Sequence, residues 1–214
     1  MNYDEVRLAI CVPTRDTIHS ICTYSLYNLS QVLTRHDIDN KLFLSPGTLI
    51  ANQRHELVLA AKEWGATHVM FIDSDIEFQP YHVLDLLDFD ELIVGAAYSK
   101  RVEPFITTAW HKIYDWNSHV NVTKQTESHI TVECMALGFC LIDVSVFEKL
   151  ELPWFILGYN KEVHQYTGED IEFFRQCNDV GIPIWLDVAT TCELGHLGTK
   201  SFKASGGIEV DPAI

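Results

Sequence analysis

Short apolar runs alternate with amphipathic stretches along most of this chain. The runs VRLAICV at 6–12 and HVMFI at 68–72 have the length of a buried strand. In the stretches between such runs, apolar residues recur at intervals of three and four, which is the period of a helix with one buried face. We therefore expect strands at 6–12, 39–44, 68–72, 92–97, 138–142 and 183–186, and helices at 17–35, 50–64, 80–87, 144–150 and 170–180.

Pro13 is expected to end the first strand, and two parts of the chain lack the alternation. Residues 106–132 are rich in aromatic and β-branched side chains, which predicts a β excursion. The tail from Thr190 onward contains several glycines and predicts irregular structure. The alternation of strands and helices along the chain predicts an α/β fold with a mostly parallel central sheet flanked by helices. With 214 residues we expect one domain over 1–214, and leave open a continuation beyond it.

The charge balance narrows the choice of partners. The chain has 30 acidic and 15 basic side chains, a formal net charge of −15 at pH 7. Such a surface repels phosphate backbones and anionic lipids, so we expect no nucleic-acid partner. An anionic small ligand would need a metal ion or a cluster of arginines beside it. Because the chain has no apolar run of about 18 residues and no basic n-region, we expect no membrane span and a cytoplasmic location.

Two carboxylates follow the most strand-like run directly. Asp73 and Asp75 flank Ser74 immediately after residues 68–72. In open α/β sheets ligands bind beyond the carboxyl ends of the strands, so both side chains can face a crevice there. They would supply the hard oxygen ligands that Mg²⁺ or Mn²⁺ takes together with phosphate oxygens. The alternative is an acidic loop that caps the helix starting at Pro80.

At these residues the sequence resembles the GT-A glycosyltransferases, nucleotide-sugar enzymes built on one Rossmann-like domain. HVMFIDSD resembles their DxD motif, AICVPTRD their first strand and donor-binding turn, and NQRHELV (52–58) an arginine-bearing helix start. GEDIEFFRQCNDVGIPIWLD (168–187) is similar to their acidic acceptor-side motif, and GHLG (195–198) to a late histidine. The five stretches stand in the family's order over most of the chain. Its compact form is most similar to the enzymes of bacteriophages and large algal viruses.

The resemblance implies a metal site and a donor site. Asp75 would bind Mn²⁺ or Mg²⁺ directly, Asp73 would hold the ribose or a metal-bound water, and His196 would complete the metal site. Arg54 would approach the nucleotide. The donor-site residues implied are Pro13, Thr14, Arg15, Arg54, Asp73, Ser74 and Asp75. The chemistry agrees, because breaking a sugar–diphosphate bond leaves charge on the β-phosphate that a divalent cation neutralises as it forms.

Glu169 and Asp170 are the candidate catalytic residues. One of them would deprotonate an acceptor hydroxyl as general base, and by analogy with the family we favour Asp170. A helix cap is the alternative, because acids at a helix start are favoured in any case.

Three further features keep two interpretations each. Lys100 and Arg101 would either counter the donor diphosphate or lie in solvent. Trp154 and Phe155 would stack on a sugar or pack in the core, and Gly138 would mark the acceptor or a strand bulge.

Together these features predict a metal-dependent glycosyltransferase that moves a hexose from a nucleoside diphosphate sugar to a carbohydrate or glycoconjugate acceptor. UDP is preferred over GDP as the commoner donor base in DxD enzymes, and both inversion and retention remain open. A DxD-type phosphatase would place its acids after the N-terminal strand. A sugar-nucleotide pyrophosphorylase would carry a glycine-rich loop where this chain has PTRD. A non-catalytic nucleotide- or sugar-binding module of the same fold is the third alternative.

Overall fold

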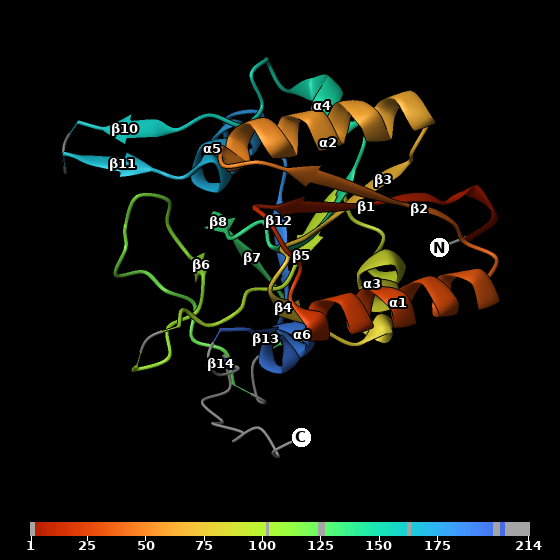
Figure 1. Ribbon diagram of the computed structural model, residues 1–214. Coiled ribbons are helices and arrows are strands. Elements are labelled where there is room, and N and C mark those ends of the chain that lie inside the picture. The colour runs from red at the N-terminus through yellow and green to blue at the C-terminus, as the bar shows by residue number, and fades with distance from the viewer. Residues whose placement is uncertain (1–2, 102, 124–126, 162–163, 199–201, 204–214) are drawn as a thin grey trace.

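A seven-stranded sheet lies between two layers of helices in the computed structural model, which describes residues 3–101, 103–123, 127–161, 164–198 and 202–203 (Figure 1). In sheet order the strands are β2 (Asp39–Pro46), β1 (Arg7–Thr14), β3 (His68–Ile72), β9 (Phe139–Asp143), β5 (Ile93–Gly95), β12 (Ile184–Asp187) and β7 (His129–Val132). β1 is parallel to β2 and β3, and β12 is parallel to β5. β9 and β7 run antiparallel to their neighbours. Five of the seven strands therefore share one direction, which confirms the predicted fold class.

Helices cover both faces of the sheet (Figure 1). The helices are α1 (Ser20–Arg35), α2 (Ile50–Trp64), α3 (Pro80–Phe89), α4 (Val146–Lys149), α5 (Glu169–Asp179) and α6 (Val188–Glu193), with a 3₁₀ turn at Tyr3–Glu5. Side chains of β1 alternate between two cores, as strand geometry requires. Leu8, Ile10 and Val12 pack with α1 and α3, whereas Ala9 and Cys11 pack with α2 and α5.

The predicted helix at 50–64 matches α2 at both ends, because Gly65 takes a left-handed conformation (φ 81°) that ends it. Pro13, however, does not end β1, which continues to Thr14. β1 pairs with β3 only as far as Cys11, and Thr14 O accepts from Gly47 N on the β2 side. Since successive residues of a parallel strand face opposite neighbours, the nitrogen of Pro13 faces the side where pairing has already stopped.

The tail is more regular than its composition predicts. Most of α6 lies in it, and then β13 (Gly195–His196) pairs with both β4 (Ile76–Glu77) and β14 (Phe202–Lys203). Two-residue strands leave no periodic pattern in a sequence, because only the partner strand defines them. The prediction of irregular structure from Thr190 onward is therefore wrong for the described part of the tail.

The β excursion predicted at 106–132 is present only in part. The remaining short strands are β6 (Ala109–Trp110), β8 (Cys134–Met135), β10 (Gly158–Asn160) and β11 (Gln165–Thr167). β6 pairs with β8. β10 and β11 form a hairpin that projects from one end of the sheet and leads directly into α5 (Figure 1). None of the helices in the described part of the chain combines the length and the apolar character needed to cross a membrane.

Candidate nucleotide-sugar site

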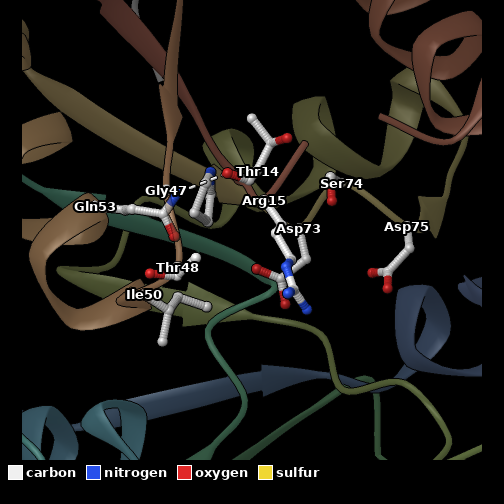
Figure 2. Close-up of a pocket in the computed structure, with 10 residues that line it drawn as sticks. Thr14, Arg15, Gly47, Thr48, Ile50, Gln53, Asp73, Ser74 and Asp75 are labelled. Atoms are coloured by element: carbon white, nitrogen blue, oxygen red, sulfur yellow. Dashed lines mark hydrogen bonds between the residues drawn. The ribbon is translucent and has the colours of Figure 1, made fainter. Parts of the chain in front are cut away.

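A pocket of about 420 Å³ opens at the carboxyl ends of β1 and β3. The strand order reverses at β1, because the chain places β2 on one side of it and β3 on the other. Such a reversal is where open α/β sheets bind ligands. The pocket brings together six of the seven predicted donor-site residues, namely Pro13, Thr14, Arg15, Asp73, Ser74 and Asp75. Figure 2 shows Ser74 and Asp75 across the pocket from the segment Gly47–Ile50.

Gln53 fixes the two strand ends that form the wall of the pocket. Its side-chain nitrogen donates to the carbonyl of Thr14 at 2.7 Å and also to that of Ser45, and the residue is buried. Gln53 was not among the predicted site residues, nor were the neighbouring wall residues Gly47, Thr48 and Ile50. A signal was available, because Gln53 and Arg54 are adjacent polar residues on the buried face of an amphipathic helix. Buried polar side chains need partners, and such partners often belong to a site.

Arg54 lies behind the pocket and does not line it. It is 2% exposed, and its guanidinium donates to Asp73 Oδ1 at 2.9 Å, to Glu169 Oε1 at 3.1 Å and to the carbonyl of Leu137 at 3.3 Å. Burial alone would lower the pKa of Arg54, but the charges of Asp73 and Glu169 outweigh burial and raise it, so the side chain stays protonated. The structure thus directs Arg54 to the two acids, away from the space predicted for the nucleotide.

Asp73 is held from several sides. Besides Arg54, the hydroxyl of Tyr98 donates to Asp73 Oδ2 at 3.0 Å. The nitrogen of Asp73 donates to the carbonyl of Gly138 at 2.8 Å. A Cβ at position 138 would overlap both the Asp73 carboxylate and the Tyr98 hydroxyl, so this glycine permits the close approach. No pattern in the sequence singled out Tyr98.

Asp75 lines the pocket, with a side chain 36% exposed. Arg101 donates to Asp75 Oδ2, and His196 Nε2 lies 3.9 Å from the same oxygen. His196 Nδ1 lies 2.8 Å from the carbonyl of Ser99. Because a carbonyl only accepts, Nδ1 carries the proton and Nε2 presents its lone pair. Burial lowers the pKa of His196 and outweighs the hydrogen bond to Ser99 and the charge of Asp75, which raise it, so this neutral form prevails at pH 7.

The tail positions His196. Its strand β13 pairs with Ile76, directly after the acidic pair, and the nitrogen of Leu197 donates to the carbonyl of Asp75 at 2.8 Å. Among the described residues, no three carboxylate, imidazole or thiol groups converge on a point that could hold a metal. In an octahedral shell with ligand distances of about 2.1 Å, adjacent donors lie roughly 3.0 Å apart. Asp75 Oδ2 and His196 Nε2 are 3.9 Å apart, so the partly exposed Asp75 side chain would have to move about 1 Å toward the imidazole for the two to share an ion.

The two candidate catalytic acids begin α5 and differ in environment. Glu169 is 7% exposed and accepts a hydrogen bond from Arg54. Asp170 is half-buried, and its Oδ1 accepts from the nitrogen of Ile171 at 2.8 Å, which is a contact of the capping kind. Burial first, and then the charge of Glu169, raises the pKa of Asp170 to about 7. A carboxylate with that pKa exchanges a proton readily at neutral pH.

The aromatic pair ahead of α5 belongs to the core. Trp154 and Phe155 are 5% and 4% exposed. Phe155 packs against Phe71 and Phe173, and Trp154 packs against Phe147. The sugar-stacking interpretation therefore fails for these residues.

No protein-family model matches the sequence, and no curated protein matches it at a significant level. Among solved structures, the crystal structure of A197 from STIV has a TM-score of 0.61 at 17% identity, over 98% of this chain and 97% of that chain. This likeness shows a shared fold.

Two further solved structures show weaker likenesses. A glycosyltransferase involved in the glycosylation of the major capsid of PBCV-1 has a TM-score of 0.35 at 11% identity, over 69% of this chain and 68% of that chain. A protein from Bacillus anthracis assigned as a glucose-1-phosphate thymidylyltransferase, in complex with a sucrose, has a TM-score of 0.42 at 13% identity, over 86% and 90%. Both are too weak to support an argument about this chain.

Proposed function

We propose that the protein is a metal-dependent glycosyltransferase of the GT-A type, which transfers a hexose from a nucleoside diphosphate sugar, UDP-sugar by preference, to a carbohydrate or glycoconjugate acceptor. The observation that carries the proposal is the approach of His196 to Asp75, which lines a pocket at the strand-order reversal beside β1 and β3. A donor seated there would reach the carboxylate and imidazole with its diphosphate, and Thr14 and Arg15 with its nucleoside.

Each group of the site has a distinct task in this proposal. A Mn²⁺ or Mg²⁺ ion held by Asp75 and His196 would neutralise charge on the departing diphosphate. Asp73 cannot turn freely, because Arg54 and Tyr98 hold both of its oxygens, so it presents a fixed edge to the donor. Asp170 would accept the proton of the acceptor hydroxyl, as an inverting reaction requires. Its raised pKa makes it a better base than an ordinary aspartate.

Release of the nucleotide from a panel of donors tests the proposal. UDP-hexoses and GDP-hexoses are incubated with the protein in Mn²⁺ or in EDTA, with water as the acceptor of the hexose, and free UDP or GDP is measured. We expect release from one donor class in Mn²⁺ only, and its loss in Asp75→Asn. Asp39→Asn is the matched control, because Asp39 is an exposed acid at the start of β2, at the far end of the strand from the pocket. Metal-independent release, or release that survives Asp75→Asn, would contradict the proposal.

A non-catalytic binding module of the same fold is the second candidate. The pairing of Asp75 with Arg101 favours it, since the carboxylate already has a cationic partner within the chain. Turnover of any donor in the same panel excludes this candidate.

A further inference from the structure

Arg101 contacts the carboxylate oxygen to which His196 is also directed. Its Nη2 lies against Asp75 Oδ2, and the side chains of the pair are 39% and 36% exposed. His196 Nε2, with its lone pair, lies 3.9 Å from that oxygen. The guanidinium therefore contacts the carboxylate oxygen that an ion shared by Asp75 and His196 would need as a ligand. The guanidinium and a divalent ion would compete for Asp75 Oδ2.

We propose that Arg101 is a displaceable cation: it pairs with Asp75 while no ion is bound, gives way to the divalent ion, and then binds the diphosphate of the donor. The binding of the diphosphate by Arg101 rests on the proposed function. The exchange of Arg101 for the ion does not require a donor.

Arg54 pairs with Asp73, and Arg101 pairs with Asp75. The difference in burial between these two arginines supports displacement of Arg101. Arg54 is buried, with three of its nitrogens bonded to fixed acceptors. Arg101 is exposed, and an exposed ion pair shifts an equilibrium by less than about tenfold. A divalent ion carries twice the charge and gains the imidazole of His196 as a further ligand, so it outcompetes the guanidinium.

The backbone beside Arg101 stays close to the site while its side chain moves. Ser99 pairs with Thr107, and the nitrogen of Lys100 donates to the carbonyl of Ile106 at 2.8 Å. Ser99 also accepts from His196, so this segment and the proposed ion ligand are directly joined. A released guanidinium therefore remains within one side-chain length of the ion. Its planar set of donors matches phosphate oxygens, whose charge a body of net charge −15 otherwise repels.

Lys100 provides a matched control. It precedes Arg101 and carries the same charge, but its Nζ lies 5.4 Å from the centre of the Trp110 ring. Replacing either residue by glutamine removes one positive charge from the same segment. Only Arg101→Gln removes the group that contacts Asp75. Any general effect of charge on cation binding therefore appears in both variants.

The first experiment measures Mn²⁺ affinity without nucleotide, from the electron paramagnetic resonance signal of the free ion. We expect Arg101→Gln to bind Mn²⁺ about threefold to tenfold more tightly than the wild type, and Lys100→Gln to change less than about twofold. Equal shifts in both variants, no shift, weaker binding in Arg101→Gln, or absence of Mn²⁺ binding in all three proteins overturns the proposal. Unchanged circular dichroism and melting temperature show that the variants are folded.

The second experiment titrates UDP calorimetrically into each protein saturated with Mn²⁺. We expect Arg101→Gln to bind UDP about tenfold more weakly, an effect opposite in sign to that on the ion. Unchanged UDP affinity in this variant overturns the claim that Arg101 binds the diphosphate. If the wild type binds Mn²⁺ and no nucleotide, the proposed function fails, while the Mn²⁺ comparison still decides whether Arg101 is displaced.

Discussion

Arg54 and Asp73 form an ion pair behind the pocket, with Nη2 2.9 Å from Oδ1 and side chains 3% and 21% exposed. The same guanidinium donates to Glu169, so a single cation ties the end of β3 to the start of α5. Two carboxylates this close would repel one another without it. Arg54 therefore stabilises the arrangement of acids on which the candidate site depends.

Replacement of Arg54 should be costly for folding. Arg54→Gln leaves two largely buried carboxylates without their cation, and we expect the free energy of unfolding at pH 7 to fall by about 3–5 kcal/mol. Arg15→Gln is the comparison, since Arg15 is 81% exposed and pairs with Asp16 only loosely at 3.7 Å; it should cost less than about 1 kcal/mol. Urea unfolding measures both. Similar small losses in the two variants would show that the buried network does not stabilise the fold.

The two acids of the DxD motif should separate into a structural and a ligand-binding residue. Asp73→Asn weakens the bond to buried Arg54 and should lower the free energy of unfolding by about 1–3 kcal/mol. Asp75→Asn breaks an exposed pair and should stay within about 1 kcal/mol of the wild type. Thermal or urea unfolding of the two variants at pH 7 gives the comparison. Greater destabilisation by Asp75→Asn would reverse these assignments.

The raised pKa of Asp170 predicts that the rate of transfer depends on pH. With its pKa raised to about 7, a base at this position is protonated at pH 6, so the rate should climb between pH 6 and 8. Asp170→Asn should leave donor binding unchanged, reduce transfer by roughly a hundredfold and abolish that rise. Rates measured from pH 5.5 to 8.5 check this. A wild-type profile that is flat across the range, or full activity in the variant, would leave Asp170 as a helix-capping residue only.

The same pKa has a consequence for stability. Since the pKa of Asp170 is about 7 in the folded chain, well above the ordinary value of 3.8 for aspartate, the folded chain holds this proton more tightly than the unfolded chain. The protonated Asp170 carboxyl therefore contributes to stability at pH 4, and this contribution declines as the pH rises to about 7. Asp170→Asn should therefore gain at least about 1 kcal/mol relative to the wild type between pH 4 and pH 8. Urea unfolding at these two pH values measures the gain, and parallel curves would refute it.

Glu172 should show the opposite pH dependence. It accepts from Thr167 at 2.6 Å, from Tyr114 at 2.9 Å and from Arg175 at 2.9 Å. Burial alone would raise the pKa of Glu172, but these bonds together lower it. The stability they provide is thus present above the ordinary glutamate pKa and is lost in acid. Glu172→Gln should cost about 1–3 kcal/mol at pH 7 and clearly less at pH 3.5, by urea unfolding. A cost independent of pH would mean that the charge of Glu172 is immaterial.

Local patterns in the sequence predict the regular elements well. The helix at 50–64 and the strand at 68–72 agree with α2 and β3 at every residue, because each combines a clear period with a defined end. The antiparallel direction of β9 left no trace in the sequence, since a buried apolar strand looks the same in either direction. The pairing of His196 with Ile76 likewise depends on contacts between distant segments.

The candidate site was predicted less completely than the fold. Motif resemblance located the pocket residues that follow β1 and β3, because strand ends can be recognised in a sequence. It did not identify Tyr98 or Gln53, whose contacts with Asp73 and with the carbonyl of Thr14 are tertiary. It also expected Arg54 at the nucleotide, whereas burial and two acids direct it inward. Which face a polar helical residue serves is settled only by packing.

Calorimetric titration of UDP and GDP, each with and without Mn²⁺, decides whether the pocket is a metal-dependent donor site. We expect the wild type to bind one nucleotide, UDP by preference, in the presence of Mn²⁺ only, and Asp75→Asn to lose this binding while Asp39→Asn retains it. Binding of neither nucleotide to the folded wild-type protein, or equal binding with and without Mn²⁺, would contradict this expectation.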